Sequence, residues 1–289
     1  MVFDIFIILA LIAITIASYT DIKTREVPDW LNYALIAVGL GVNLIYSVIY
    51  WDYTYILRSA IGLAAAVLLG MVMFYTGQWG GGDSKMVFGL GALLGLSYPF
   101  KLDFFAKFLV NMLFAGALYV MVWAIISGIK NRAKVIKKFK KILENDKLRK
   151  IRYYSAILIV LGLILIYFID LDSSLKIIFV FMSIFLYSAN YFILIIKSIE
   201  EAVMIKSIEP EKLTEGDWIV KDIKAEGKYI TGPKELGIKK DQIKMLLKLK
   251  QQGKLKKIIV KYGIPFIPSF LMAIIYTILT DSIVLLSFI

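Results

Sequence analysis

The chain has 289 residues, of which 60% are hydrophobic, and it carries a formal net charge of +12. This hydrophobicity is too high for a soluble globular domain and predicts a protein that crosses a membrane several times. The chain contains no cysteine and no histidine. Their absence excludes disulfides, thiolate nucleophiles, zinc sites with Cys or His ligands, and a serine-type triad. Acid–base chemistry therefore falls to Asp, Glu, Lys or Tyr, and no metal ion or cofactor is expected.

Eight apolar stretches predict membrane helices, which gives an all-α polytopic integral membrane protein with about eight transmembrane helices. The first stretch has neither a basic region before it nor a small-residue cleavage site after it. It is therefore interpreted as a retained helix rather than a signal peptide. The stretches cover approximately residues 2–19, 30–50, 55–76, 84–96, 104–127, 153–169, 175–196 and 264–288.

Two polar regions interrupt the apolar stretches. Residues 130–152 carry eleven Lys or Arg against two acidic residues, and their apolar residues recur at helical spacing. This pattern predicts an amphipathic helix on the membrane surface. Residues 197–262 predict a small cytoplasmic α+β insertion before the last helix, with a hairpin that pairs 218–220 with 229–230 and a helix over 239–250. The expected divisions are a membrane core at 1–127, a basic cytoplasmic loop at 128–152, two helices at 153–196, a cytoplasmic subdomain at 197–262 and a last helix at 263–289.

The distribution of Lys and Arg predicts the orientation in the membrane. Basic or large loops alternate with short turns that are acidic, neutral or carry one lysine. By the positive-inside rule the basic loops are cytoplasmic, so the N-terminus is expected outside. The net charge is accordingly assigned to this rule and to anionic lipid rather than to nucleic acid. The cytoplasmic group is 20–29, 130–152 and 197–262; the external group is 51–54, 98–103 and 170–174; Trp30, Trp51 and Trp79 are expected at the membrane–water interfaces.

A turn dense in glycine follows the third apolar stretch and reads Gln-Trp-Gly-Gly-Gly-Asp-Ser-Lys-Met over residues 78–86. Three consecutive glycines weaken a helix, so they indicate a tight bend that another segment approaches closely. A carboxylate such as Asp83 at the edge of a buried membrane segment is costly and is a functional-site hypothesis by default. Asp21 ends the first stretch on the same cytoplasmic side. Paired carboxylates that share a proton can hydrolyse peptides, since one deprotonates a water while the other donates to the carbonyl oxygen.

These residues resemble a known family. The pattern Gly80-x-Gly82-Asp83-x-Lys85 resembles the GxGD signature of type IV prepilin peptidases and archaeal preflagellin peptidases, membrane aspartic proteases of peptidase family A24. Asp21, followed by Glu26-Val27-Pro28-Asp29, resembles the first aspartate of that family and the motif after it. Residues 263–268, Gly-Ile-Pro-Phe-Ile-Pro, and residues 213–218, Leu-Thr-Glu-Gly-Asp-Trp, resemble segments of archaeal members.

The resemblance implies an aspartic endopeptidase that removes short basic leaders from archaellin or type IV pilin-like precursors. Asp21 and Asp83 would be catalytic, and Gly80, Gly82 and Lys85 would shape the site. The expected location is the cell membrane, in several passes, with the site at the cytoplasmic face. The partners are precursors with class III leaders and the lipid bilayer, without nucleic acid. The acidic Glu26 and Asp29 would attract the lysines of the leader. Bacterial relatives often carry a four-cysteine insert and N-methylate their product; this chain has no cysteine, so methylation is not transferred.

Plainer interpretations remain for these residues. In these interpretations Asp83 is a helix cap, Asp21 is an ordinary interfacial residue, and Asp29 is a cap of the second helix. Lys85 would either reach lipid phosphate or interact with the aspartate pair. The region 197–262 would either dock substrate or serve as a structural cover.

Three other classes of protein are alternatives. A proton- or cation-coupled transporter also uses paired carboxylates, but usually near the bilayer midplane between repeated halves. A non-enzymatic membrane subunit would leave the glycine turn unexplained. A presenilin-type protease would need a Pro-Ala-Leu motif, which the sequence lacks.

Overall fold

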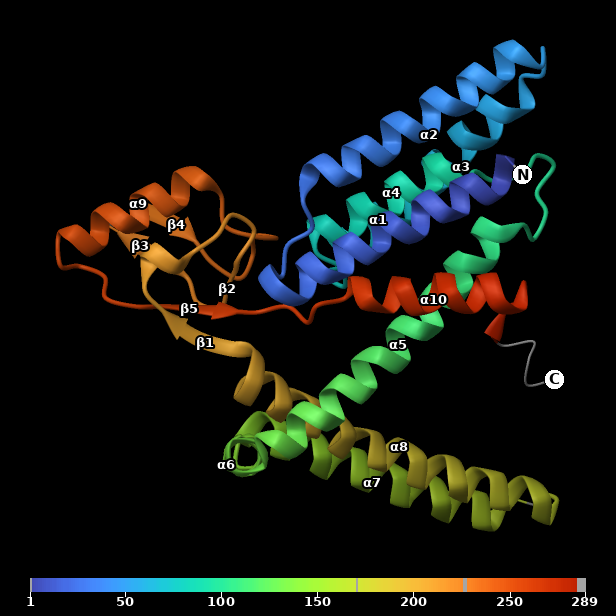
Figure 1. Ribbon diagram of the computed structural model, residues 1–289. Helices are drawn as coiled ribbons and strands as arrows, with labels where there is room; N and C mark the ends of the chain where they lie inside the picture. Colours follow the sequence, from blue (N-terminus) through green and yellow to red (C-terminus); the bar gives the residue numbers. More distant parts are fainter. Residues whose placement is uncertain (1, 170, 226–227, 285–289) are drawn as a thin grey trace. The chain divides into compact units, whose positions relative to one another are not determined.

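The computed structural model describes residues 2–169, 171–225 and 228–284 (Figure 1). The chain divides into two compact units. The first comprises Met1–Val122, Ile208–Ile258 and Tyr262–Ile289; the second comprises Trp123–Ser207 and Ile259–Lys261.

Apolar helices make up most of the first unit. Local backbone signals set their ends. Arg25 has a φ of 61° and stops the first helix, and Pro28 occupies the N-cap of the second with a φ of −60°, which proline favours at a helix start. These helices are α1 (Val2–Thr24), α2 (Asp29–Ile49), α3 (Thr54–Tyr75), α4 (Gly81–Leu94), the first part of α5 (Phe104–Lys130), and α10 (Ile267–Thr280).

Helix length supports fewer membrane spans than the sequence predicts. Among the described residues, six helices are long and apolar enough to cross a membrane: α1, α2, α3, α5, α7 (Asp146–Phe168) and α8 (Ser173–Ile199). The helices α4 and α10 have 14 residues each, about 21 Å at 1.5 Å per residue, against about 30 Å of hydrocarbon. The expected last span to Phe288 is too long, because α10 ends where Asp281 takes a left-handed conformation with φ 47°; residues 285–289 lie outside the described part. Eight spans are thus not confirmed.

The short helix α4 forms the centre of the first unit. Its residues from Ser84 onward are mostly buried although they include two glycines and an alanine. These small residues let the backbones approach. A Cβ at Gly91 would collide with the backbone of Gly62 in α3, and one at Gly39 of α2 would lie 2.6 Å from the backbone of Ala92. Glycine therefore costs helix propensity here but permits close packing of α4 against α2 and α3.

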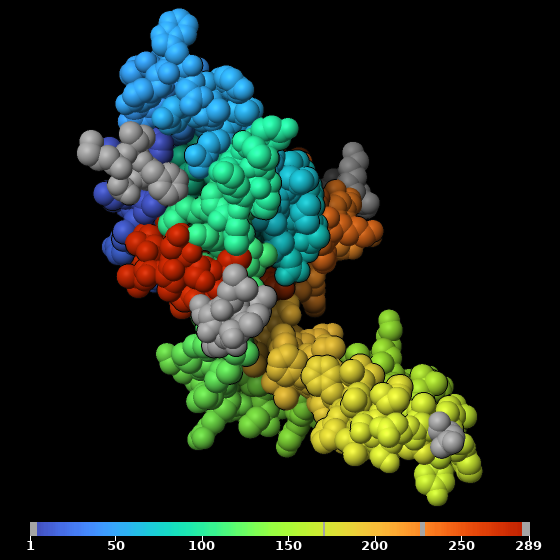
Figure 2. Space-filling model, turned by 90° about the vertical axis from the view of Figure 1, so that its right-hand side faces the viewer, coloured from blue at the N-terminus to red at the C-terminus, as the bar shows by residue number. Residues whose placement is uncertain are grey.

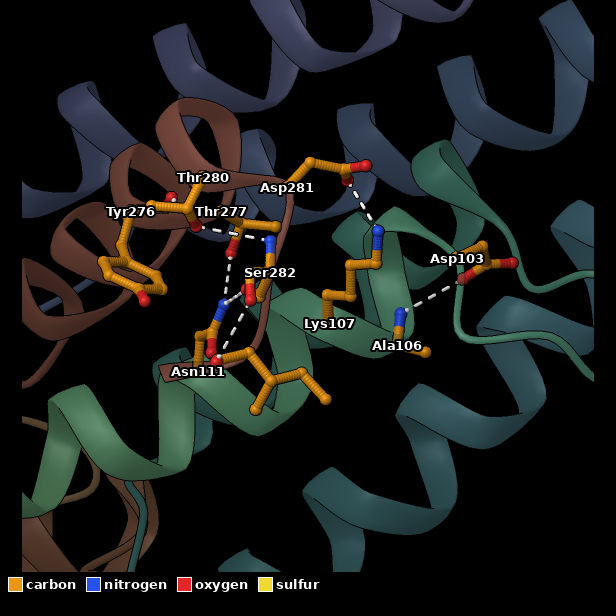
Figure 3. A network of polar contacts seen from close by, with 10 residues as sticks. Asp103, Ala106, Lys107, Asn111, Tyr276, Thr277, Thr280, Asp281 and Ser282 are labelled. Carbon is orange, nitrogen blue, oxygen red and sulfur yellow. Dashed lines mark hydrogen bonds and ion pairs between the residues drawn. The ribbon is translucent and has the colours of Figure 1, made fainter. Parts of the chain in front are cut away.

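The far end of α10 is joined to α5 by polar contacts (Figure 3). The buried Asn111 side chain donates to the Thr277 hydroxyl at 2.9 Å and to the Ser282 carbonyl at 2.8 Å, and it accepts from the N–H of Val284 at 2.8 Å. Lys107 pairs with Asp281 at 2.7 Å. Because Asn111 satisfies main-chain groups beyond the end of α10, it holds that end in place.

The second unit contains the basic region and two apolar helices. The predicted amphipathic helix over 130–152 is instead two elements: α6 (Arg132–Leu143) and the first turns of α7. The break falls at Asn145, whose side chain accepts from the N–H of Leu148 and caps α7, as asparagine favours. The helices α7 and α8 lie along one another (Figure 2, yellow-green and yellow). Most of their apolar side chains are exposed, as expected for lipid-facing helices. A π-helical turn (Glu200–Met204) leads into β1 (Ile205–Ile208), the neighbour of β5 (Ile258–Lys261).

The insertion before α10 contains the predicted α+β elements, but its hairpin differs. The strands β3 (Ile223–Ala225) and β4 (Lys228–Thr231) pair antiparallel, with Ala225 opposite Lys228. The expected partner, Trp218–Ile219, forms the separate strand β2. Only two residues separate β3 from β4 in the chain, so pairing starts with the nearer segment. The helix expected over 239–250 is confirmed as α9 (Lys240–Gln251), and a short 3₁₀ turn covers Pro210–Lys212.

Candidate active site

Asp21 lies in the last turn of α1, which continues to Thr24, five residues beyond the end that the sequence predicts. Its side chain is only 5% exposed. One carboxylate oxygen, Oδ2, accepts a hydrogen bond of 2.9 Å from the main-chain N–H of Ile267, the first residue of α10. The first N–H groups of a helix have no partner within it. Asp21 thus satisfies one of them while α10 supplies a donor to a buried carboxylate.

Asp83 lies in the first turn of α4 and is partly buried. Its Oδ2 accepts a hydrogen bond of 2.9 Å from the N–H of Gly80, the N-cap residue. The capping interpretation is therefore confirmed. It does not compete with a role in chemistry, because Asp83 is also close enough to Asp21 for the two charges to repel. The structure brings together the two carboxylates that the sequence singles out.

Of the three consecutive glycines before Asp83, two have a close neighbour and one does not. A Cβ at Gly82 would lie 3.1 Å from Cβ of Val27, and one at Gly80 would lie 3.3 Å from Oδ2 of Asp83. At Gly81 the nearest side-chain atom would be 3.8 Å away, an ordinary contact. Gly82 thus lets the segment that follows α1 pack against the start of α4.

Lys85 pairs with Asp29 rather than with the aspartate pair. The Nζ atom of Lys85 lies 2.7 Å from Oδ1 of Asp29 and 5.6 Å from the centre of the Tyr33 ring. The Asp29 side chain is 61% exposed. It does not cap α2, because Pro28 holds the N-cap position and Asp29 is the first helical residue. Glu26 is exposed in the turn between α1 and α2.

Aromatic side chains pack beside the two carboxylates, and the sequence did not predict this. Trp79 is 3% exposed, with its ring centre 6.1 Å from that of Phe266 and 5.6 Å from that of Phe270. Trp79 therefore packs inside the protein, next to the glycine turn, instead of facing the lipid headgroups. A Cβ at Gly116 of α5 would lie 2.6 Å from the Phe266 ring. In the sequence, Pro265 and Pro268 indicated that a helix starts near them, but not which side chains that helix, α10, would contact.

The insertion contacts the segments next to both carboxylates. The Trp218 ring lies over Gly77, where a Cβ would be 3.2 Å from it. The guanidinium of Arg25 lies 4.8 Å from the centre of the Tyr262 ring. Burial raises the pKa of the Asp217 carboxyl, and the Thr214 N–H and Arg25 act in the opposite direction. These contacts lie within the first unit, so the insertion has a defined position beside the site.

The chain is similar to peptidases that process leader peptides. Residues 7–128 match the sequence model of the type IV leader peptidase family. A preflagellin peptidase of Methanocaldococcus jannaschii is 39% identical over 87 residues, 30% of this chain and 37% of that protein. A preflagellin peptidase of Methanococcus voltae is 27% identical over 138 residues, 45% and 59% of the two chains. The prepilin peptidase EppA of Methanothermobacter thermautotrophicus is 32% identical over 88 residues, 30% and 23% of the two chains.

These matches are partial. The chain spans 37% of the length of the M. jannaschii relative. The family match ends at residue 128, so it includes Asp21 and Asp83 but neither the insertion nor α10. No solved structure matches the chain significantly.

Proposed function

We propose that the chain is a membrane aspartic endopeptidase, because residues 7–128 match the sequence model of the type IV leader peptidase family. It removes short basic leaders from archaellin or type IV pilin-like precursors with class III leaders. Cleavage takes place at the cytoplasmic face of the cell membrane, where the hydrophobic helix of the precursor can remain in the bilayer. The core of the enzyme is residues 1–127, and the insertion 197–262 docks or covers the substrate.

The observation that carries this proposal is the meeting of the buried Asp21 from α1 with the partly buried Asp83 from α4 inside the matched region. Like charges held together in a buried site favour a state in which one carboxyl keeps its proton. The ionised carboxylate takes a proton from a water, which attacks the scissile carbonyl carbon. The protonated partner donates to the carbonyl oxygen. Proton return to the leaving nitrogen then breaks the peptide bond.

The surrounding residues have supporting roles in this proposal. Gly80 and Gly82 keep the start of α4 free of Cβ atoms that would displace Asp83 or Val27. Lys85 holds Asp29 and so fixes the start of α2 beside α4. Glu26 and Asp29 give the edge of the site a negative charge that attracts the lysines of the leader.

The test is cleavage of a tagged precursor co-expressed with the chain in membranes. The variants Asp21→Asn and Asp83→Asn keep the size of the side chain but remove the ionisable group. Each is expected to lower the rate of processing by about 10²- to 10⁴-fold at unchanged protein level, the usual contribution of a general acid or base. Asp172→Asn, which removes a carboxylate at the N-cap of α8 outside the core and the insertion, is the control and should retain processing. Full activity in either of the first two variants would contradict a two-carboxylate mechanism.

The transporter alternative lacks a specific observation in its favour. Asp21 and Asp83 both lie at helix ends, whereas carboxylates that couple ions in transporters usually lie near the midplane. If wild-type membranes leave such precursors intact, this alternative becomes the leading one.

A further inference from the structure

The first turn of α10 lies outside the region that matches the family, yet it donates directly to Asp21. We propose that the main-chain N–H groups at this turn, chiefly that of Ile267, are positioning groups. They hold Asp21 as the ionised base and leave Asp83 as the carboxyl that carries the proton. This inference rests on the proposed function, and it adds the assignment of the two roles.

The hydrogen bond between the N–H of Ile267 and Asp21 is part of the protein core and not a chance contact at the surface. The N–H of Ile267 meets Oδ2 of Asp21 at 2.9 Å, and both residues are buried. The N–H of the preceding residue, Phe266, also acts as a hydrogen-bond donor to this carboxylate. Donors of this kind stabilise the charged form of a carboxylate, and the N-terminus of a helix adds a partial positive charge. A protonated Asp21 would give up most of this stabilisation.

Both ends of α10 are fixed, so the donors are held in position. At the first end, the Phe266 ring fills the space over Gly116 of α5 and meets the ring of Trp79. At the far end, Asn111 of α5 bonds to Thr277 (Figure 3). The ten helical steps from Ile267 to Thr277 correspond to about 15 Å of helix. A rigid element held at both ends keeps the N–H of Ile267 aimed at Asp21 without reorganisation during the reaction.

The charges that face Asp21 favour the same assignment. From α4, Asp83 repels a second negative charge, so only one of the pair is readily ionised. From the end of α1, Arg25 attracts the charge on Asp21. From α5, the phenol of Tyr119 lies within reach of that charge. Asp83 has the N–H of Gly80 as its donor. Asp21 therefore has the stronger set of groups that stabilise a negative charge.

The test replaces single amide bonds by esters, using α-hydroxy acids in cell-free synthesis into lipid nanodiscs. An ester at position 267 removes the N–H that donates to Asp21 and leaves the side chain unchanged. An ester at position 269 is the matched control. It removes the N–H of Ser269, which donates to the Phe266 carbonyl at 3.0 Å in the same turn. A loss that was merely structural would affect both esters alike.

The readout is the pH dependence of kcat/KM for a precursor with a basic leader. With the ester at 267, the acidic limb of the profile should move up by about one to two pH units, the value of a hydrogen bond to a charged group. The ester at 269 should leave the limb in place. If the two esters give the same profile as the wild type, or move it equally, the inference is overturned.

A second measurement separates this inference from the proposed function. The ¹³C signal of the Asp21 carboxyl, assigned by its loss in Asp21→Asn, can be titrated whether or not the protein cleaves a precursor. A titration that moves to higher pH in the 267 ester, and not in the 269 ester, supports the inference even if no precursor is processed. An unchanged titration overturns it even if processing is normal.

Discussion

At the scale of single residues, the edge of the site combines one paired and one exposed acidic side chain. Asp29 forms an ion pair of 2.7 Å with Lys85, so part of its charge is already compensated. Glu26 is exposed in the turn next to it. A basic leader that approaches this edge would compete with Lys85 for Asp29 but would meet Glu26 directly. The two carboxylates are therefore not equivalent in the attraction that we propose.

The charge of Glu26 should affect binding more than catalysis. Exposed ion pairs contribute about 0.2–1 kcal/mol each, so Glu26→Gln should raise KM for the precursor by about two- to fivefold, with kcat nearly unchanged. Asp29→Asn should raise KM by less, because Lys85 already balances its charge. Steady-state kinetics at low and high salt would measure both effects, and salt should reduce the difference between wild type and Glu26→Gln.

An acidic residue at a distance provides the control for this prediction. Asp241→Asn removes one exposed charge from the first turn of α9 in the insertion and should leave KM unchanged. An equal rise of KM in all three variants would indicate a general effect of net charge. No rise in Glu26→Gln would remove Glu26 from the site that recognises the leader.

At the scale of elements, the start of α4 depends on the absence of one Cβ. Gly82 faces Val27, which is buried, and a Cβ there would lie 3.1 Å from Cβ of Val27. Gly82→Ala should destabilise the protein by about 1–3 kcal/mol, the usual cost of overpacking, and should lower processing because Asp83 lies one residue away. Gly81→Ala is the control, since its Cβ has ordinary space. Thermal unfolding and processing of both variants would test this; equal behaviour would contradict a specific role for Gly82.

Local patterns predicted most elements, while their contacts depend on distant parts of the chain. The apolar stretches gave the helices, and Pro28, Pro265 and Pro268 marked where helices begin. The acidic pair was also predicted, because Asp21 and Asp83 stand out in apolar surroundings. The burial of Trp79, the N–H of Ile267 and the partner of Lys85 were not predicted. Each depends on a segment that is far away in the sequence, and no local periodicity specifies such a contact.

The pairing of the hairpin shows the same limit. Trp218 and Ile219 are apolar and β-prone, so the sequence favoured them as partners of β4. In the structure the side chain of Trp218 packs over Gly77 instead. Strand propensity identified a segment with a role in packing but not the surface against which it packs.

At the scale of the whole molecule, the topology depends on whether α4 crosses the membrane. The helix α4 is short, but together with the residues that follow it α4 runs antiparallel to α3 between Gly70 and Arg58. The Ser84 hydroxyl donates to the Gly70 carbonyl near one end, and the N–H of Leu96 donates to the Arg58 carbonyl near the other. Non-helical residues 95–97 add up to about 10 Å to the 21 Å of helix. Leu96 is buried and its N–H is bonded, which is the condition for irregular backbone at membrane depth.

Whether α4 crosses the membrane also decides on which side of the membrane the basic helix α6 lies. If α4 and residues 95–97 cross the bilayer together, α5 returns the chain to the cytoplasm and α6 obeys the positive-inside rule. If α4 does not cross, α5 leads outward and the lysines of α6 lie outside the cell. The first arrangement is expected, because a dense cluster of lysines strongly disfavours translocation.

Single cysteines can decide between these arrangements, because the chain contains none of its own. We expect Gln78→Cys and Lys137→Cys to react with an impermeant maleimide only after the cells are opened, and Lys101→Cys to react in intact cells. All three positions are exposed in the structure. Labelling would therefore depend on the side of the membrane on which each cysteine lies and not on its burial. Tyr53→Cys, in the short turn before α3, is the external reference. If Gln78→Cys and Lys101→Cys label from the same side while Lys137→Cys labels from the opposite one, α4 does not cross. The active site would then share its side of the membrane with the turn at 95–103 instead of with α6.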